Sequence, residues 1–354
     1  MRSEYELYDP SVTPEHSMTD FVESGDLRKH LFRDMAGQLQ TLSLTGFGFT
    51  KDWLPCVNLK AVSICFQVSW YEMTRGTSPF FYLAELPNLE ILYFSDKSQY
   101  CPAVSQLRSV LTFNRLHTLT FSEIVDTMLR SVFTWLNLPA LRQFTLLCGY
   151  ERHNHHKGLR RNDPFFAPWE CSWLDMILES ATHIRLLVDV PSVIRGFHER
   201  ENSGAAYATL MFMESASDEI PLFKMTLDKC PGLMSVKEDS EFYEMIFATM
   251  THCLRQWVLS ITSMLIIGIG SQKTLPPTVI LRPLFKRCHD LTSLTVENCD
   301  TGRLITALSS VDVADVAAPG IRELRLQGCS ANAGDLESLS RERETLGFVI
   351  TQIQ

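Results

Sequence analysis

The sequence predicts an α/β fold of the solenoid type, a curved horseshoe with parallel strands on its concave face and helices on its convex face. Two observations predict it. One spacing of apolar residues recurs along most of the chain, and the segments between its copies carry apolar residues at helical spacing. One such unit cannot fold alone, because ordering about 25 residues costs more free energy than burying three aliphatic side chains provides. The array is therefore expected to fold as a whole.

The clearest copies of this spacing lie near the C-terminus. Between Cys288 and Cys299, apolar side chains stand at Leu291, Leu294 and Val296, and the same frame returns over residues 321–329. This L-x-x-L-x-L-x-x-C pattern is the strand-and-turn half of a leucine-rich repeat. We expect the three apolar residues to point inward from a short strand, and the Asn or Cys that follows to satisfy backbone groups at the turn.

Six further copies share the L-x-x-L-x-L spacing, which makes eight in all. They are Leu39-Leu42-Leu44, Leu59-Val62-Ile64, Leu89-Leu92-Phe94, Leu116-Leu119-Phe121, Leu141-Phe144-Leu146 and Leu254-Trp257-Leu259. The first five begin 20, 30, 27 and 25 residues apart, close to the period of about 20–29 residues of leucine-rich repeats. Weaker copies, each with a polar or misplaced third residue, are Ile184-Leu187, Leu222-Met225-Leu227 and Leu233-Val236.

The connections are expected to supply the helices of the convex face. Apolar residues over 80–86, 304–308 and 336–339 each form one helical face, and Pro87 and Pro139 stop a helix before the next strand.

The ends of the chain complete the predicted domain plan. Residues 1–25 are expected to be disordered, residues 26–37 to form a capping helix, and residues 38–354 to form an irregular leucine-rich-repeat domain. Residues 346–353 predict a last strand, whose uncapped edge suggests a covering partner or a shortened gene product.

A loop at about 148–173 is predicted to interrupt the repeats. It contains a basic stretch over residues 151–161 and five residues of types that bind zinc, namely Cys148, His153, His155, His156 and Cys171. Their spacing matches no zinc motif, so no metal or other cofactor is predicted. Two alternatives stay open for the basic stretch, a contact with an acidic partner and a solvated loop.

Composition excludes several classes of protein. The chain has 354 residues, 45% of them hydrophobic, and a formal net charge of −9, which argues against nucleic acid as a partner. The most apolar stretch, residues 257–270, is too short and too polar to span a membrane, and no signal peptide is recognised. The ten cysteines contain no C-x-x-C pair, so we expect reduced thiols in the cytoplasm or nucleus.

The segment from Cys288 to Leu308 resembles the cysteine-containing repeats of F-box leucine-rich-repeat proteins, most closely their divergent fungal members. This resemblance implies a substrate-receptor subunit of a cullin-type ubiquitin ligase. An F-box normally precedes the repeats. Residues 1–38 lack its Leu-Pro opening and apolar helices. We therefore expect this chain not to bind the ligase adaptor and to keep only the recognition surface.

The predicted function is a non-enzymatic protein-binding scaffold. The binding residues would flank the central strand positions and project from the concave face. They are Thr41, Ser43, Ile91, Tyr93, Thr118, Thr120, Gln143, Thr145, Ser293, Thr295, Glu323 and Arg325. Two other classes of protein are less well supported by the sequence. An enzyme would be expected to carry a catalytic or nucleotide-binding motif, and no G-x-S-x-G, H-E-x-x-H, phosphate-binding or dinucleotide-binding motif is found. A GTPase-activating repeat protein would usually have more regular repeats.

Overall fold

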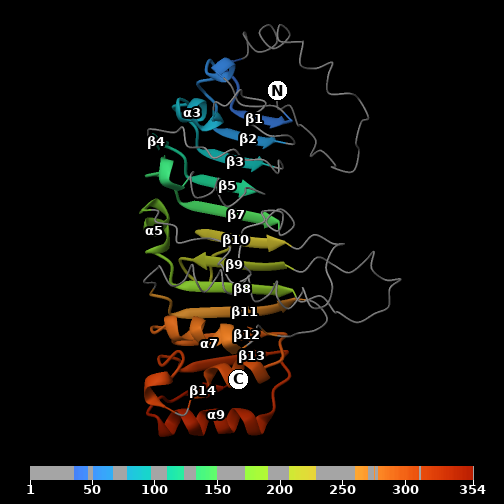
Figure 1. The fold of residues 1–354 in the computed structure, drawn as a ribbon, viewed down its shortest axis with the longest axis vertical. Coiled ribbons are helices and arrows are strands. Elements are labelled where there is room, and N and C mark those ends of the chain that lie inside the picture. The colour runs from blue at the N-terminus through green and yellow to red at the C-terminus, as the bar shows by residue number, and fades with distance from the viewer. Residues whose placement is uncertain are drawn as a thin grey trace, which may run out of the picture.

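The computed structural model describes residues 36–46, 51–66, 78–96, 110–122, 133–149, 172–189, 207–228, 260–269, 275, 278–310 and 312–353. In this part of the chain, twelve strands form one sheet in the order β1-β2-β3-β5-β7-β10-β9-β8-β11-β12-β13-β14. Every strand runs parallel to its neighbours except β9. Figure 1 shows the strands stacked as a single layer along the long axis. The predicted mixed α/β class with a mainly parallel sheet is therefore confirmed.

Seven of the eight predicted frames lie on strands of this sheet. The strands that carry them are β1 (Thr41–Thr45), β2 (Ala61–Phe66), β3 (Ile91–Asp96), β5 (Thr118–Ser122), β7 (Gln143–Gly149), β12 (Ser293–Glu297) and β13 (Glu323–Gln327). The eighth frame, at 254–259, lies outside the described residues. A frame does occur at β11 (Ser263–Ile269): Ile261, just before the strand, and Met264 and Ile266 within it occupy the three inward positions, and all three are buried. Of the predicted strand over 346–353, only Gln352–Ile353 form β14, because Leu346 caps α9 and Gly347, at φ 85°, turns the chain at the end of the helix.

The middle of the sheet departs from sequential stacking. Strands β8 (His183–Asp189), β9 (Tyr207–Met213) and β10 (Phe223–Asp228) occupy the sheet in reverse order, so that β10 pairs with β7 and β8 pairs with β11. The predicted weak frames are misplaced here. Leu187 was predicted to point inward, but Leu186 does so and Leu187 is half-buried on the other face. The weak frame at Leu233-Val236 lies outside the described residues.

Two rows of buried side chains run across the sheet in register. The first row passes through Leu42, Val62, Leu92, Leu119, Phe144, Phe223, Phe212, Ile184, Met264, Leu294 and Leu324. The second row lies two residues further along each parallel strand. A repeated backbone pattern accompanies these rows: the Gln40 carbonyl accepts from Lys60 and Ala61, and the Thr262 carbonyl accepts from Thr292 and Ser293 in the same way. The repeat is thus present in hydrogen bonding as well as in sequence.

Aromatic rings carry the core across the reordered strands. Phe144 of β7 stacks on Phe223 of β10 with ring centroids 5.5 Å apart, and Phe223 stacks on Phe212 of β9 at 5.9 Å. On the other side of Phe144, Phe121 meets it edge to face at 5.9 Å, and Trp173 does so at 5.4 Å. Because large rings bury more apolar area than aliphatic side chains, they fill the space where the regular order of strands is broken.

Helices and short turns of the connections pack on the same side as these buried rows. They are the 3₁₀ turn η2 (Lys51–Trp53), α3 (Pro79–Ala84), α5 (Ser172–Leu178), α7 (Thr278–Arg287), α8 (Gly302–Leu308), the 3₁₀ turn η5 (Val313–Asp315) and α9 (Ala333–Thr345). Buried residues of the helices, such as Phe80, Leu83 and Leu304, join the core of the strand rows. A two-stranded sheet, β4 (Leu111–Thr112) with β6 (Leu136–Asn137), belongs to the same series of connections. Within the described chain, no helix is long and apolar enough to cross a membrane.

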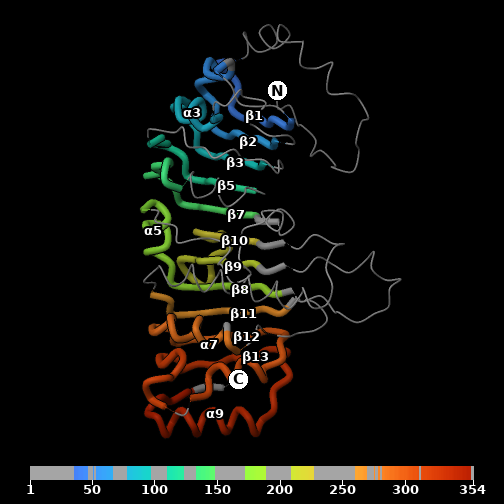
Figure 2. The backbone as a smooth tube through the Cα atoms, viewed as in Figure 1, coloured from blue at the N-terminus to red at the C-terminus, as the bar shows by residue number. Residues whose placement is uncertain are grey.

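The chain tube in Figure 2 follows this order from the N-terminal strands to α9 at the opposite end of the stack. The predicted disordered segment 1–25 and most of the predicted helix 26–37 lie outside the described residues, which begin with a turn at Ala36. Of the predicted loop at about 148–173, residues 150–171 lie outside the description. Of the same predicted loop, residues 148 and 149 belong to β7, and residues 172 and 173 belong to α5.

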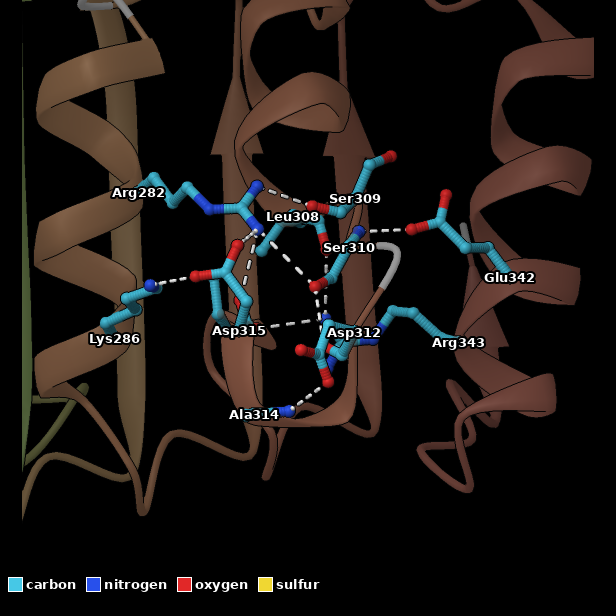
Figure 3. Close-up of polar contacts among 11 residues, drawn as sticks. Arg282, Lys286, Leu308, Ser309, Ser310, Asp312, Ala314, Asp315, Glu342 and Arg343 are labelled. Carbon is cyan, nitrogen blue, oxygen red and sulfur yellow. Dashed lines mark hydrogen bonds and ion pairs between the residues drawn. The ribbon is translucent and has the colours of Figure 1, made fainter.

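A polar network fastens the last connections to one another (Figure 3). Arg282 and Lys286 of α7 both form ion pairs with Asp315, and their hydrogen bonds, first that of Lys286, hold the pKa of this carboxyl below its ordinary value. Arg343 of α9 is fully buried and donates to the carbonyls of Leu308 (3.3 Å), Ala317 (3.0 Å) and Ala318 (2.8 Å). This network ties the connection over residues 308–318 to the helices on both sides of it.

Candidate binding surface on the open face of the sheet

The open face is the face of the sheet opposite the buried rows, formed by the strand residues that alternate with them. All twelve residues predicted to bind a partner lie on it, and none of them is buried. Thr41, Ser43, Ile91 and Arg325 are exposed, and the other eight are half-buried. The structure divides the twelve into two groups, eight on β1, β3, β5 and β7 and four on β12 and β13, with β10, β9, β8 and β11 between them.

One central row connects the two groups. It passes in register through Ser43, Ser63, Tyr93, Thr120, Thr145, Lys224, Met211, Arg185, Leu265, Thr295 and Arg325. Neighbouring members are about 4.8 Å apart, the spacing between hydrogen-bonded strands. A sheet ladder fixes this spacing, so the row presents its side chains as a preorganised line.

Hydrogen bonds between neighbouring strands link several of the predicted residues. Thr118 Oγ1 donates to Gln143 Oε1 at 3.3 Å, and Ser293 Oγ donates to Glu323 Oε2 at 2.9 Å. Arg325 Nε donates to the other oxygen of Glu323 at 2.9 Å. The Ser293 hydroxyl, followed by the Arg325 guanidinium, lowers the pKa of Glu323. Glu323 is therefore ionised at neutral pH and paired within the surface.

Sequence reasoning missed the middle of the open face. A group of six residues there, which we name the central patch, consists of Lys224, Met211, Arg185, Leu187, Leu265 and Ile267. Most of its members are aliphatic, whereas the corresponding positions on β1, β2, β3 and β5 are mainly Ser and Thr. A signal existed in β8, where His183 and Arg185 alternate with the inward Ile184 and Leu186, but the apolar Leu187 on the open face hides the alternation.

Strand β8 also carries a buried histidine on the open face. His183 is 4% exposed, and its Nδ1 lies 2.7 Å from Ser263 Oγ on the neighbouring strand β11. Burial, followed by the charge of Arg185, lowers the pKa of His183, so the ring is neutral at pH 7. Its Nε2 has no hydrogen-bond partner within the described part of the chain. The histidine and serine thus connect two strands without the orienting carboxylate of a catalytic triad.

The buried thiols of Cys288 and Cys299 are poor nucleophiles and poor metal ligands. Burial raises the pKa of Cys288 to about 12, and burial is also the main cause that raises the pKa of Cys299 to about 12. Among the residues that the structure covers, no group of three or more His, Cys, Asp or Glu side chains could hold a metal ion. Of the five loop residues of zinc-binding type, Cys148 belongs to β7, and the other four lie outside the residues that the structure describes.

Comparison with known proteins gives little to assign the chain to a family. No model of a known protein family matches the sequence, and no curated protein matches it. A solved structure of the leucine-rich repeat-containing protein LegL7 from Legionella pneumophila aligns over 87% of this chain and 82% of its own, with 12% identity and a TM-score of 0.29. A TM-score this low supports no conclusion about shared fold or function.

Proposed function

We propose that the protein is a leucine-rich-repeat solenoid that acts as a non-enzymatic scaffold and binds another protein through the open face. The observation that carries this proposal is the central row, which crosses the sheet from Ser43 on β1 to Arg325 on β13. A long row of fixed, partly exposed side chains suits recognition of an extended or convex protein surface.

The residue types on the open face support the same proposal. Protein interfaces are enriched in Tyr, Met and Arg, and a few such residues usually dominate the binding free energy. Tyr93, Met211, Arg185 and Arg325 all lie in the central row, where Arg325 is exposed, Tyr93 and Arg185 are half-buried and Met211 is buried. We expect Tyr93 and Arg325 to contribute most at the two ends of the row.

A more specific form of the proposal follows from the sequence resemblance alone. The repeats around Cys288 and Cys299 resemble those of F-box leucine-rich-repeat proteins, which suggests recognition of a ubiquitin-ligase substrate. Residues before Ala36 lie outside the described part of the chain, so the adaptor-binding end rests on the sequence alone. We expect the chain as given not to bind the ligase adaptor.

An affinity pull-down tests the proposal. The full chain and the Tyr93→Ala/Arg325→Ala variant are immobilised and exposed to a fungal cell lysate, because the sequence resemblance is to fungal proteins. Mass spectrometry identifies the retained proteins, and circular dichroism checks that each bait is folded. We expect a protein retained by the native chain and reduced at least about tenfold with the variant, as removal of two interface anchors predicts.

The matched control removes exposed apolar side chains away from the open face. Met176 on α5 and Val279 on α7 are 52% and 75% exposed, and Met176→Ala/Val279→Ala should retain the same partner as the native chain. A partner lost with this control but kept with Tyr93→Ala/Arg325→Ala would move the binding surface to the helices. Recovery of the ligase adaptor by the native chain would contradict the expectation about the F-box.

A further inference from the structure

Charged side chains near the two ends of the sheet are neutralised within the molecule. Glu90 Oε1 lies 4.0 Å from Lys60 Nζ, and its Oε2 lies 3.9 Å from His117 Nε2, at the start of β2, β3 and β5. At the other end, Arg325 Nη2 lies 2.6 Å from Glu323 Oε1. Within the described residues, these carboxylates therefore neutralise Lys60 and Arg325.

The central patch differs, because its two cations have no such neutralisation. The side chains of Lys224 and Arg185 form no ion pair among the residues that the structure describes. Arg185 Nε is buried and has no hydrogen-bond partner in the described chain. A buried donor without an acceptor is unfavourable, so an acceptor supplied from outside would be favoured there.

The arrangement of the patch defines the shape of what would bind it. Lys224 and Arg185 stand on either side of Met211 in the central row, two strands apart, which is about 10 Å at the usual strand spacing. Leu265 follows Arg185 in the row, and Leu187 pairs with Ile267 beside it. The two cations therefore flank the buried Met211, and the half-buried Leu265, Leu187 and Ile267 form an apolar surface beside Arg185.

We infer that the central patch binds an acidic segment of a partner protein, with carboxylates on Lys224 and Arg185 and an apolar side chain on Leu265, Leu187 and Ile267. A segment in the polyproline II conformation rises about 3.1 Å per residue with three residues per turn, so carboxylates three residues apart share one face and span about 9 Å. The guanidinium fork of Arg185 suits a carboxylate, which would also satisfy its buried Nε.

Charge distinguishes this occupant from a nucleic acid. A phosphate backbone is held by many cations and is repelled by a negatively charged protein, and this chain carries a formal net charge of −9, with two cations in the patch that have no ion pair among the described residues. An apolar surface beside the cations adds nothing to phosphate binding but adds affinity for an aliphatic or aromatic side chain. An acidic, apolar protein segment fits both features.

The inference rests on the proposed scaffold function and names the chemistry of its partner. A phage-displayed library of random 12-residue peptides is selected against the full chain, and the selected peptides are synthesised with a fluorescent label. Dissociation constants are measured by fluorescence anisotropy for the native chain, for Lys224→Glu/Arg185→Glu and for the milder Lys224→Gln/Arg185→Gln. We expect selected peptides that combine Asp or Glu with Leu, Met or an aromatic residue, and affinity reduced at least about tenfold in both variants.

The matched control is Arg287→Glu/Arg341→Glu, which changes the net charge equally on exposed residues of α7 and α9. Its affinity should stay within about twofold of the native value, and native binding should weaken as salt is added. The glutamine variant keeps the test valid if charge reversal disturbs folding.

Four results would overturn the inference. Two of them are selected peptides without acidic enrichment and peptide binding unchanged in both central-patch variants. Either would leave the scaffold function intact if Tyr93→Ala/Arg325→Ala weakens peptide binding. Binding of a labelled 20-nucleotide polyuridine that the central-patch variants abolish would assign the patch to nucleic acid instead. Selection of no peptide at all would count against both the inference and the proposed function.

Discussion

The position of each residue relative to the sheet decides what its side chain does. Leu294 and Thr295 are neighbours in β12, yet Leu294 is fully buried and Thr295 is half-buried on the open face. Successive side chains in a strand point to opposite faces, so one side chain stabilises the core and the next is available to a partner.

This difference can be measured by chemical denaturation. Leu294→Ala and Leu324→Ala each leave a cavity in the row of buried residues, and each should lower the free energy of unfolding by about 2–5 kcal/mol. Thr295→Ala should lower it by less than about 1 kcal/mol, because it leaves no cavity in the core. Equal losses for Leu294→Ala and Thr295→Ala would show that the two faces are assigned wrongly.

Elements formed by a clear frame could be predicted from the sequence, and those without it could not. Strands β1, β2, β3, β5 and β7 alternate buried aliphatic or aromatic residues with residues that are mostly small or polar, so their inward positions were identified. In β9, by contrast, Leu210-Met211-Phe212-Met213 is apolar at every position and both of its faces are buried. A strand that is apolar on both faces carries no period of two, so neither its existence nor its direction could be predicted.

The missed part of the candidate surface has the same cause. Lys224 and Arg185 belong to β10 and β8, where the predicted frames were displaced or incomplete. Their approach across Met211 depends on the reversed order β10-β9-β8, which is a property of pairing between strands distant in sequence. The twelve residues predicted on β1, β3, β5, β7, β12 and β13 could be identified from the alternation within each strand alone, and this alternation places them on one face of the sheet.

Among the connections, α9 depends on one buried arginine. Arg343→Met removes the three hydrogen bonds that this side chain donates to the carbonyls of Leu308, Ala317 and Ala318; Ala318 O still accepts from Ile321 N. Burial lowers the pKa of Arg343, and the charge of the nearby Glu342 opposes this shift. We expect the free energy of unfolding to fall by about 2–5 kcal/mol in a urea titration.

The matched substitution on the same helix is Arg341→Met. Arg341 is exposed, so its loss should change the free energy of unfolding by no more than about 0.5 kcal/mol. If Arg343→Met were as mild as Arg341→Met, the network in Figure 3 would not be what fastens α9 to the preceding connection.

At the scale of the whole molecule, one sheet of twelve strands joins surfaces that the chain order keeps apart. Strand β10 stands beside β7 although β8 and β9 precede it in the sequence, and the aromatic stack of Phe144, Phe223 and Phe212 fills the core at this point. This order places the central patch between the two groups of predicted residues and makes the open face continuous. Binding through an uninterrupted face requires that order.

Disulfide trapping of introduced cysteine pairs tests this order most directly. Thr145 and Lys224 are Cα partners in adjacent strands, about 4.8 Å apart and within disulfide range, whereas Thr145 and Arg185 are three strands apart, about 14 Å. Under mild oxidation, Thr145→Cys/Lys224→Cys should form the cross-link, identified by mass spectrometry of tryptic peptides, and Thr145→Cys/Arg185→Cys should not. A cross-link in the second pair and none in the first would place β8 beside β7 and contradict the continuous open face.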